Sequence, residues 1–114
     1  MVKELKVISD FYEFMLWVIR HTERFPRHHR YSLGIVIENR LQRILEQLLR
    51  AKYSRKKARY LQDANMELEV LRFQVRLATD LRALPAKSHG HAAKRMQEIG
   101  AQIGGWLSSR SAEE

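Results

Sequence analysis

Apolar residues recur at steps of three and four along nearly the whole chain, and no segment shows the two-residue alternation of a β-strand. This pattern puts an apolar stripe on each of several amphipathic helices, so the chain buries those residues by packing helix on helix. Pro26 and Pro85 are the only prolines, and each is expected to interrupt a helix because proline lacks an amide hydrogen and clashes with the preceding turn. The pattern therefore predicts an all-α protein.

Four helices are predicted, over residues 7–24, 33–53, 55–84 and 88–108. Ser32 is the expected N-cap of the second helix, because its hydroxyl can accept from a free amide of the first turn. The residues expected in the core are Ile8, Phe11, Tyr12, Met15, Val18 and Ile19 in the first helix, Ile37, Leu41, Ile44, Leu45 and Leu48 in the second, Leu61, Ala64, Leu68, Leu71 and Val75 in the third, and Ala92, Met96, Ile99, Ile103 and Leu107 in the fourth.

Short connections favour an antiparallel up-down-up-down four-helix bundle. We expect one such domain over residues 1–108, followed by a polar tail at 109–114. The topology places the loop at 25–31 and the Pro85 turn at one end of the bundle. The joint at Ser54 and both termini lie at the other end.

The third helix carries a second apolar face, and this indicates a second neighbour, which could be another subunit. Gly100, Gly104 and Gly105 of the fourth helix each cost about 1 kcal/mol relative to alanine, and close approach of a neighbouring helix is the expected reason. Large aromatic residues beside small ones are typical of subunit interfaces, although core positions explain them equally well. The predicted interface residues are Trp17, Phe73, Leu77 and Trp106.

The chain has 21 Lys and Arg against 13 Asp and Glu, a formal charge of +8 over 114 residues. Such a surface usually serves a polyanion, and the alternatives are nucleic acid, an acidic protein face or an anionic membrane. The longest uncharged run, residues 14–19, is far shorter than the ~20 residues of a membrane-spanning helix. With no cysteine and no visible signal peptide, we expect a cytoplasmic protein without disulfides or thiolate metal sites.

Two groups of cations are candidate binding sites. The first lies at residues 50–60, where six cations without an acid are interleaved with Tyr53 and Tyr60, and phosphate contact is favoured over a merely solvated helix joint. The second lies at residues 20–31, where Glu23 is the one acid, and here functional contact and an exposed loop explain the charges equally well. The candidate residues are Arg50, Lys52, Arg55, Lys56, Lys57 and Arg59 in the first group and Arg20, Arg24, Arg27 and Arg30 in the second.

The histidines suggest two further hypotheses, both disfavoured. His28, His29, His89 and His91 are expected at one end of the bundle, but no carboxylate accompanies them in these loops and arginines crowd the first pair, so no metal or other cofactor is expected.

The spacing of Arg24 to His29, and of Arg82 to His89, fits the loose motif of the HEPN class of helical ribonucleases. In that class a polar residue usually follows the arginine, whereas Phe25 follows the first arginine here. No catalytic residue is therefore assigned, and the ribonuclease remains an alternative.

Three segments carry a resemblance to a known family: residues 25–34 (FPRHHRYSLG), 71–77 (LRFQVRL) and 98–107 (EIGAQIGGWL). They resemble the four-helix-bundle family that contains the accessory variability determinant proteins of diversity-generating retroelements and the ribosomal-RNA intervening-sequence proteins. The resemblance runs from about Lys6 to Leu107. Relatives often carry a basic residue where this chain has Val36.

The resemblance implies a function. Accessory variability determinant proteins form a ring-shaped homopentamer with a basic surface, bind the retroelement's reverse transcriptase and nucleic acid, and support mutagenic synthesis of complementary DNA from template RNA. In that scheme the protein is not an enzyme. The intervening-sequence branch, whose role is undefined, is the alternative within the family.

Overall fold

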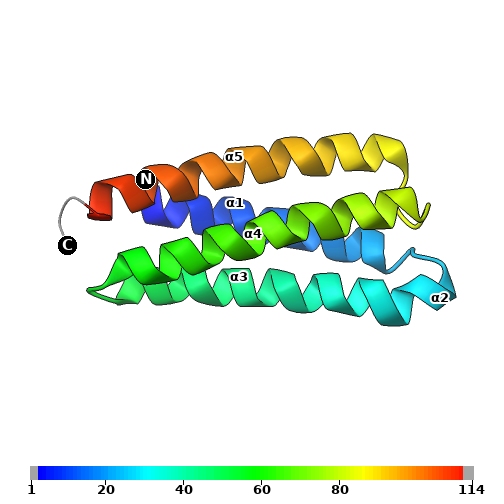
Figure 1. The fold of residues 1–114 in the computed structure, drawn as a ribbon, viewed down its shortest axis with the longest axis horizontal. Helices are drawn as coiled ribbons and strands as arrows, with labels where there is room; N and C mark the ends of the chain where they lie inside the picture. The colour runs from blue at the N-terminus through cyan, green and yellow to red at the C-terminus, as the bar shows by residue number, and fades with distance from the viewer. Residues whose placement is uncertain (1–2, 112–114) are drawn as a thin grey trace.

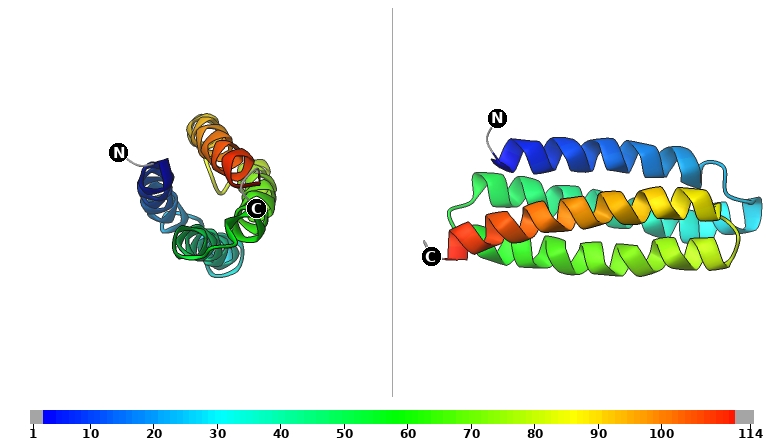
Figure 2. Two further views of the ribbon diagram at one scale, coloured as in Figure 1. Left: turned by 90° about the vertical axis from the view of Figure 1, so that its left-hand side faces the viewer. Right: turned by 90° about the horizontal axis from the view of Figure 1, so that it is seen from above.

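Four long helices run alternately up and down along a body 46 Å long and 22 by 21 Å across (Figure 1). The computed structural model describes the backbone of residues 3–111 and the side chains of residues 6–109. The long helices are α1 (Lys3–Thr22), α3 (Ile35–Tyr53), α4 (Lys57–Asp80) and α5 (Ala86–Ser111). Each packs against two others: α1 and α4 both lie against α3 and α5 (Figure 2). The predicted all-α four-helix bundle is confirmed.

The two ends of the bundle carry the connections that the sequence predicted. The α3–α4 joint lies at the end where α1 begins and α5 finishes, and the other two connections lie at the opposite end (Figure 1). Helix α5 continues to Ser111, so the predicted polar tail at 109–114 begins inside a helix, and residues 112–114 lie outside the described part of the chain.

The connection between α1 and α3 is helical, and the prediction that Ser32 is an N-cap is wrong. A short helix α2 (Arg27–His29) and a π-helical turn η1 (Arg30–Gly34) lead directly into α3. The Ser32 hydroxyl donates to the His28 carbonyl at 3.0 Å, inside a turn that has already formed. The helical segment begins at Arg27 with Pro26 as its N-cap, and the amides of His29 and Arg30 donate to the Pro26 carbonyl at 2.8 and 2.9 Å.

Helix α4 ends at Asp80, four residues before its predicted end, in a Schellman motif. Arg82 takes a left-handed conformation with φ of 61°, and the amide of Ala83 donates back to the Ala78 carbonyl at 2.8 Å. The turn points Ala83 and Leu84 into the core, where both are buried.

The core lies between the facing stripes of the four long helices. The predicted stripes of α3, α4 and α5 are confirmed, except that Leu45 and Leu107 are half-buried. In α1 the buried stripe is rotated about the helix axis relative to the predicted one. Tyr12, predicted in the core, is 57% exposed, whereas Phe14, which was not predicted there, is 1% exposed. Trp106 is 2% exposed and packs within the core of its own subunit.

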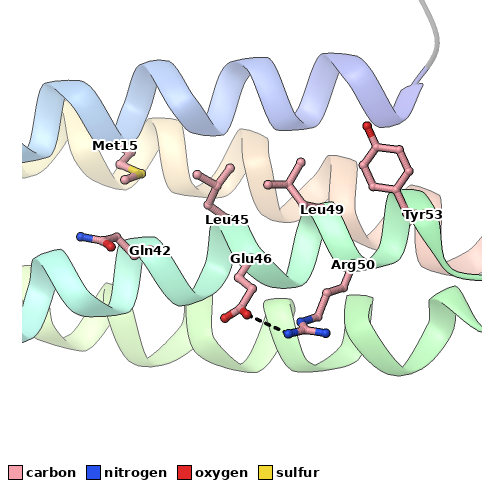
Figure 3. A pocket seen from close by; sticks show the side chains of 7 residues that line it. All are labelled: Met15, Gln42, Leu45, Glu46, Leu49, Arg50 and Tyr53. Atoms are coloured by element: carbon pink, nitrogen blue, oxygen red, sulfur yellow. Dashed lines mark hydrogen bonds and ion pairs between the residues drawn. The ribbon is translucent and has the colours of Figure 1, made fainter.

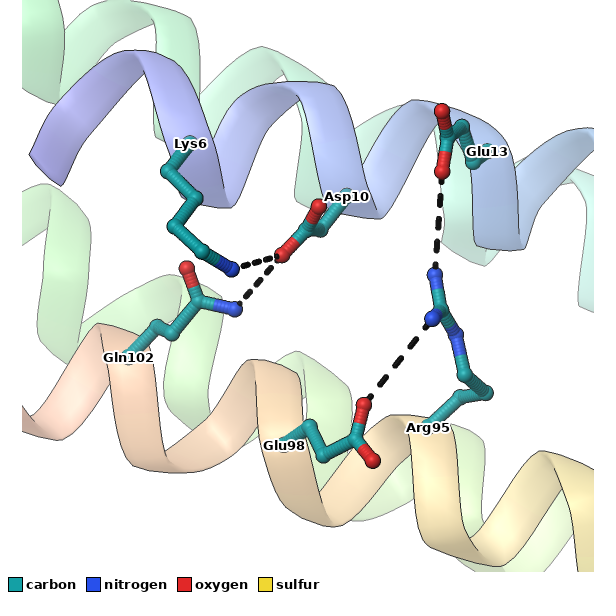
Figure 4. A network of polar contacts seen from close by, with 6 residues as sticks. All are labelled: Lys6, Asp10, Glu13, Arg95, Glu98 and Gln102. Atoms are coloured by element: carbon teal, nitrogen blue, oxygen red, sulfur yellow. Dashed lines mark hydrogen bonds and ion pairs between the residues drawn. The ribbon is translucent and has the colours of Figure 1, made fainter. Parts of the chain in front are cut away.

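A hydrogen bond and an ion pair join α1 to α5 along one edge of the bundle (Figure 4). The Asp10 carboxylate accepts from Lys6 Nζ at 2.7 Å and from Gln102 Nε2 at 2.9 Å. The hydrogen bond from Lys6 and that from Gln102 lower the pKa of Asp10 below its usual value. About one turn further along, the Arg95 guanidinium of α5 lies 4.0 Å from the Glu13 carboxylate of α1 and 3.9 Å from the Glu98 carboxylate of its own helix.

The lowered pKa makes a testable contribution to stability. Because the folded state favours ionised Asp10, this contribution is present above the unfolded pKa of about 3.9 and is lost as the pH falls through the lower folded value. We expect Asp10→Asn to destabilise the protein at pH 7, with the deficit shrinking below about pH 4. Urea unfolding across this pH range measures it. Asp63→Asn, on an exposed position of α4, is the control, and an equal deficit at pH 7 and pH 3 would contradict the assignment.

The glycines of α5 offer a second test. A Cβ at Gly104 meets nothing within 4 Å, so the predicted approach of a neighbouring helix is absent there, whereas one at Gly100 lies 2.6 Å from an Arg72 guanidinium nitrogen. We expect Gly104→Ala to stabilise the subunit by about 1 kcal/mol. Gly100→Ala should raise the stability less, because the new methyl group displaces the Arg72 guanidinium, which donates to the Met96 carbonyl at 3.2 Å. Thermal melts of the two variants, at subunit concentrations low enough to avoid association, compare them directly.

Candidate polyanion-binding poles

The six cations of the first predicted group lie at the α3–α4 joint, which we call the joint pole. Arg55, Lys56 and Arg59 are exposed, and no ion pair to them occurs within the described residues. Arg50 is paired with Glu46 at 2.9 Å, and this hydrogen bond raises the pKa of its guanidinium. Lys52 lies 5.0 Å from the ring centre of Tyr53, close enough for a cation–π contact.

Lys57 has a structural role at this pole. Its Nζ donates to the carbonyls of Ala51 at 2.7 Å and Lys52 at 3.0 Å. These carbonyls belong to the last turn of α3, where the helix dipole favours a cation. Lys57 therefore caps α3, and its replacement would disturb the joint itself.

The four arginines of the second group lie at the opposite end, which we call the arginine pole. Arg20, Arg24, Arg27 and Arg30 are all exposed, and none of them has an acid partner within the described residues. The guanidinium of Arg30 lies 5.4 Å from the ring centre of Tyr31.

The fold adds two cations that the sequence analysis did not assign to this pole. Arg82 lies on the α4–α5 turn and Lys87 in the first turn of α5, and the topology brings both to the same end as α2 (Figure 1). Both are exposed. The predicted antiparallel topology was the signal that could have found them, because it already placed the Pro85 turn beside the loop at 25–31.

Along the middle of the bundle most of the cations are paired. Arg40 and Arg43 of α3 both donate to Glu67 of α4, at 2.7 and 3.0 Å. Further pairs within the described residues join Arg72 to Glu69, Arg76 to Asp80, Lys6 to Asp10, and Arg95 to both Glu13 and Glu98. These acids are used along the flanks of the helices, so the unpaired positive charge is concentrated toward the two poles.

Exposed tyrosines accompany the cations at both poles. Tyr53 is 78% exposed and Tyr31 is 64% exposed, whereas Tyr60 is half-buried against the core. An exposed ring beside a cation can stack on an unpaired base while the cation contacts its phosphate. Each pole therefore combines the two contacts that single-stranded nucleic acid uses.

The histidines do not form a metal centre in the described part of the molecule, where no group of three or more metal-ligating side chains converges. His28 and His29 stack on each other with ring centres 4.0 Å apart, and His91 packs on Trp17 at 4.8 Å. His89 borders a different hollow, beside Phe73. In the part of the chain that the structure describes, no helix is long and apolar enough to cross a membrane.

A long antiparallel bundle with paired charges along its flanks and exposed cations at both ends defines the class, a basic four-helix-bundle protein. The model of the bAvd-like family, the bacterial accessory variability determinants, matches residues 2–110. The chain belongs to this family, as its three sequence segments indicated. No curated protein gives a significant match.

Proposed function

We propose that this protein is the non-catalytic accessory subunit of a diversity-generating retroelement, acting in the cytoplasm without a cofactor. It binds the reverse transcriptase and nucleic acid, template RNA or complementary DNA, and assembles into a ring-shaped homopentamer. Membership of the bAvd-like family supports an accessory role.

The observation that carries the proposal is the segregation of charge. Arg55, Lys56 and Arg59 at the joint pole stand exposed without acid partners in the described structure. Unpaired cations on one surface repel one another, and phosphate groups relieve this repulsion while releasing counterions. A polyanion is the ligand that benefits most from this arrangement.

The joint pole is tested by the triple variant Arg55→Glu, Lys56→Glu and Arg59→Glu. We expect RNA binding at low salt to weaken at least tenfold, and the slope of log K against log salt to fall by about 2, since each phosphate contact with a single strand contributes about 0.7. Fluorescence anisotropy with labelled single-stranded RNA measures both. Lys57 is left unchanged because it caps α3.

The matched control reverses charge at two positions away from the joint. The double variant Arg55→Glu, Lys56→Glu changes the net charge by as much as Arg76→Glu, Lys94→Glu, whose positions lie on α4 and α5 away from the joint. A general effect of net charge would weaken binding equally in both doubles. Equal losses, or an unchanged salt slope in the triple variant, would contradict the proposal.

The arginine pole is proposed as the second contact zone. Reversing Arg24, Arg27 and Arg30 is expected to reduce co-purification with the reverse transcriptase of the same retroelement or to lower RNA affinity. Circular dichroism should show unchanged helicity, because these side chains are exposed. Retention of both activities would remove this pole from the proposal.

A further inference from the structure

The α4–α5 turn contains the one residue with a left-handed backbone within the described residues 3–111. Arg82 has a φ of 61°, a conformation that crowds the Cβ of an ordinary residue and that glycine adopts without this cost. The five glycines of the chain lie elsewhere, in η1 and α5, and none of them has a positive φ. The position that most favours glycine therefore carries an arginine.

Hydrogen bonds and burial explain why this conformation persists. The Arg82 amide donates to the Thr79 carbonyl at 2.9 Å, and the amides of Ala83 and Leu84 donate to the Ala78 carbonyl at 2.8 and 3.1 Å. Ala83 and Leu84 are 8% and 5% exposed, so the chain must reverse sharply at residue 82 to bring them into the core. These contacts would impose the left-handed backbone on any residue at this position.

The side chain of Arg82, by contrast, makes no contact inside its own subunit. It is exposed, and no hydrogen bond, ion pair or cation–π contact to its guanidinium occurs among the side chains of residues 6–109. A cation with a structural role differs from this: Lys57 at the joint pole donates to two carbonyls at the end of α3. A strained backbone beneath a side chain that contacts only solvent points to a use of that side chain outside the subunit.

Other exposed cations share this end of the bundle. Arg27 of α2, Arg30 of η1 and Lys87 of α5 lie at the same end as Arg82 (Figure 1) and have no ion pair within the described residues. At the joint pole, in contrast, Arg50 is held by Glu46 of its own helix (Figure 3). Two connections that are distant in the sequence thus present cations at one end of the molecule.

We propose that Arg82 is a phosphate-binding residue of the arginine pole and contacts the backbone of single-stranded RNA together with Arg27 and Arg30. A guanidinium can donate two parallel hydrogen bonds to one phosphate. A strand carries a phosphate on every nucleotide and can therefore meet cations from both connections, whereas a protein partner needs an acid placed for each of them. Tyr31, 64% exposed, offers a ring on which an unpaired base stacks. The inference rests on the polyanion binding of the proposed function and assigns one residue to it.

Three substitutions at residue 82 separate the charge from the backbone strain. Arg82→Gly removes both, Arg82→Gln removes only the charge, and Arg82→Lys keeps both. With labelled single-stranded RNA at low salt, we expect the glycine and glutamine variants to bind roughly three- to fivefold more weakly, and the slope of log K against log salt to fall by about 0.7, the contribution of one phosphate contact. Arg82→Lys should stay within about twofold of the wild type, because it keeps the charge. Fluorescence anisotropy measures both quantities.

Thermal melts of the same variants measure the strain. We expect the melting temperature of Arg82→Gly to rise by about 3–6 °C, because glycine relieves the one strained residue of the turn. The glutamine and lysine variants keep the strain and should melt within about 1 °C of the wild type. Higher stability together with weaker binding is the result expected of a binding residue. An Arg82→Gly variant that melts below the wild type would overturn the proposal, because Arg82 would then stabilise the end of α4 itself.

The matched control is Lys94→Gln, which removes one positive charge from an exposed position on α5. Its RNA affinity should change less than that of Arg82→Gln, and equal losses would overturn the proposal by showing a general effect of net charge. Unchanged RNA affinity in Arg82→Gln, with reduced co-purification of the reverse transcriptase, would also overturn it and indicate an acidic protein face at this pole. If the joint-pole triple variant weakens RNA binding while Arg82→Gln does not, the proposed function stands and only the assignment of Arg82 fails.

Discussion

The burial of the α4 stripe is the contact on which the rest of the bundle depends. Leu61, Leu68 and Leu71 are fully buried, and α4 packs on both α3 and α5. Fully burying a leucine stabilises a fold by about 1.5–3 kcal/mol. These contacts fix the position and rotation of α4. They therefore also fix the outward direction of Phe73 and Leu77 and the end of the bundle at which the α3–α4 joint lies. The positions of the joint pole and of the predicted interface residues Phe73 and Leu77 therefore follow from the placement of α4.

The distribution of charge over the surface also follows from the side-by-side packing of the helices. Helices packed side by side bring cations and acids within reach across their flanks, as Arg40 and Glu67 show at 2.7 Å. At the ends of the bundle, a helix terminus has no flanking neighbour to supply an acid. Arg55, Lys56 and Arg59 at one end, and the four arginines at residues 20–30 at the other, therefore remain exposed for a geometrical reason. Their density in the sequence makes each end strongly positive. Exposed flank pairs contribute little to stability, typically below about 1 kcal/mol, but they determine which faces are neutral.

The sequence predicted the helices well because their periodicity is strong, and its errors occurred where local rules compete. Ser32 has the chemistry of an N-cap, but the helical segment had already begun at Arg27, directly after Pro26. Tyr12 has the right spacing for the core, yet the rotation of α1 about its axis leaves it 57% exposed. Arg82 occupies the left-handed position after the end of α4, where glycine is usual. Its residue type therefore gave no sign that α4 ends there. Tertiary packing decided each of these positions.

The candidate sites were predictable in part. Residues 50–60 were visible as a run of cations, but the capping role of Lys57 required the distance between its Nζ and the end of α3. Arg82 and Lys87 are separated from the arginine cluster by some fifty residues of sequence and join it through topology alone. The apolar surface formed by Met15 of α1 and by Leu45 and Leu49 of α3 (Figure 3) could not be predicted from the sequence. It depends on the rotation of both helices about their own axes, which had to be known first.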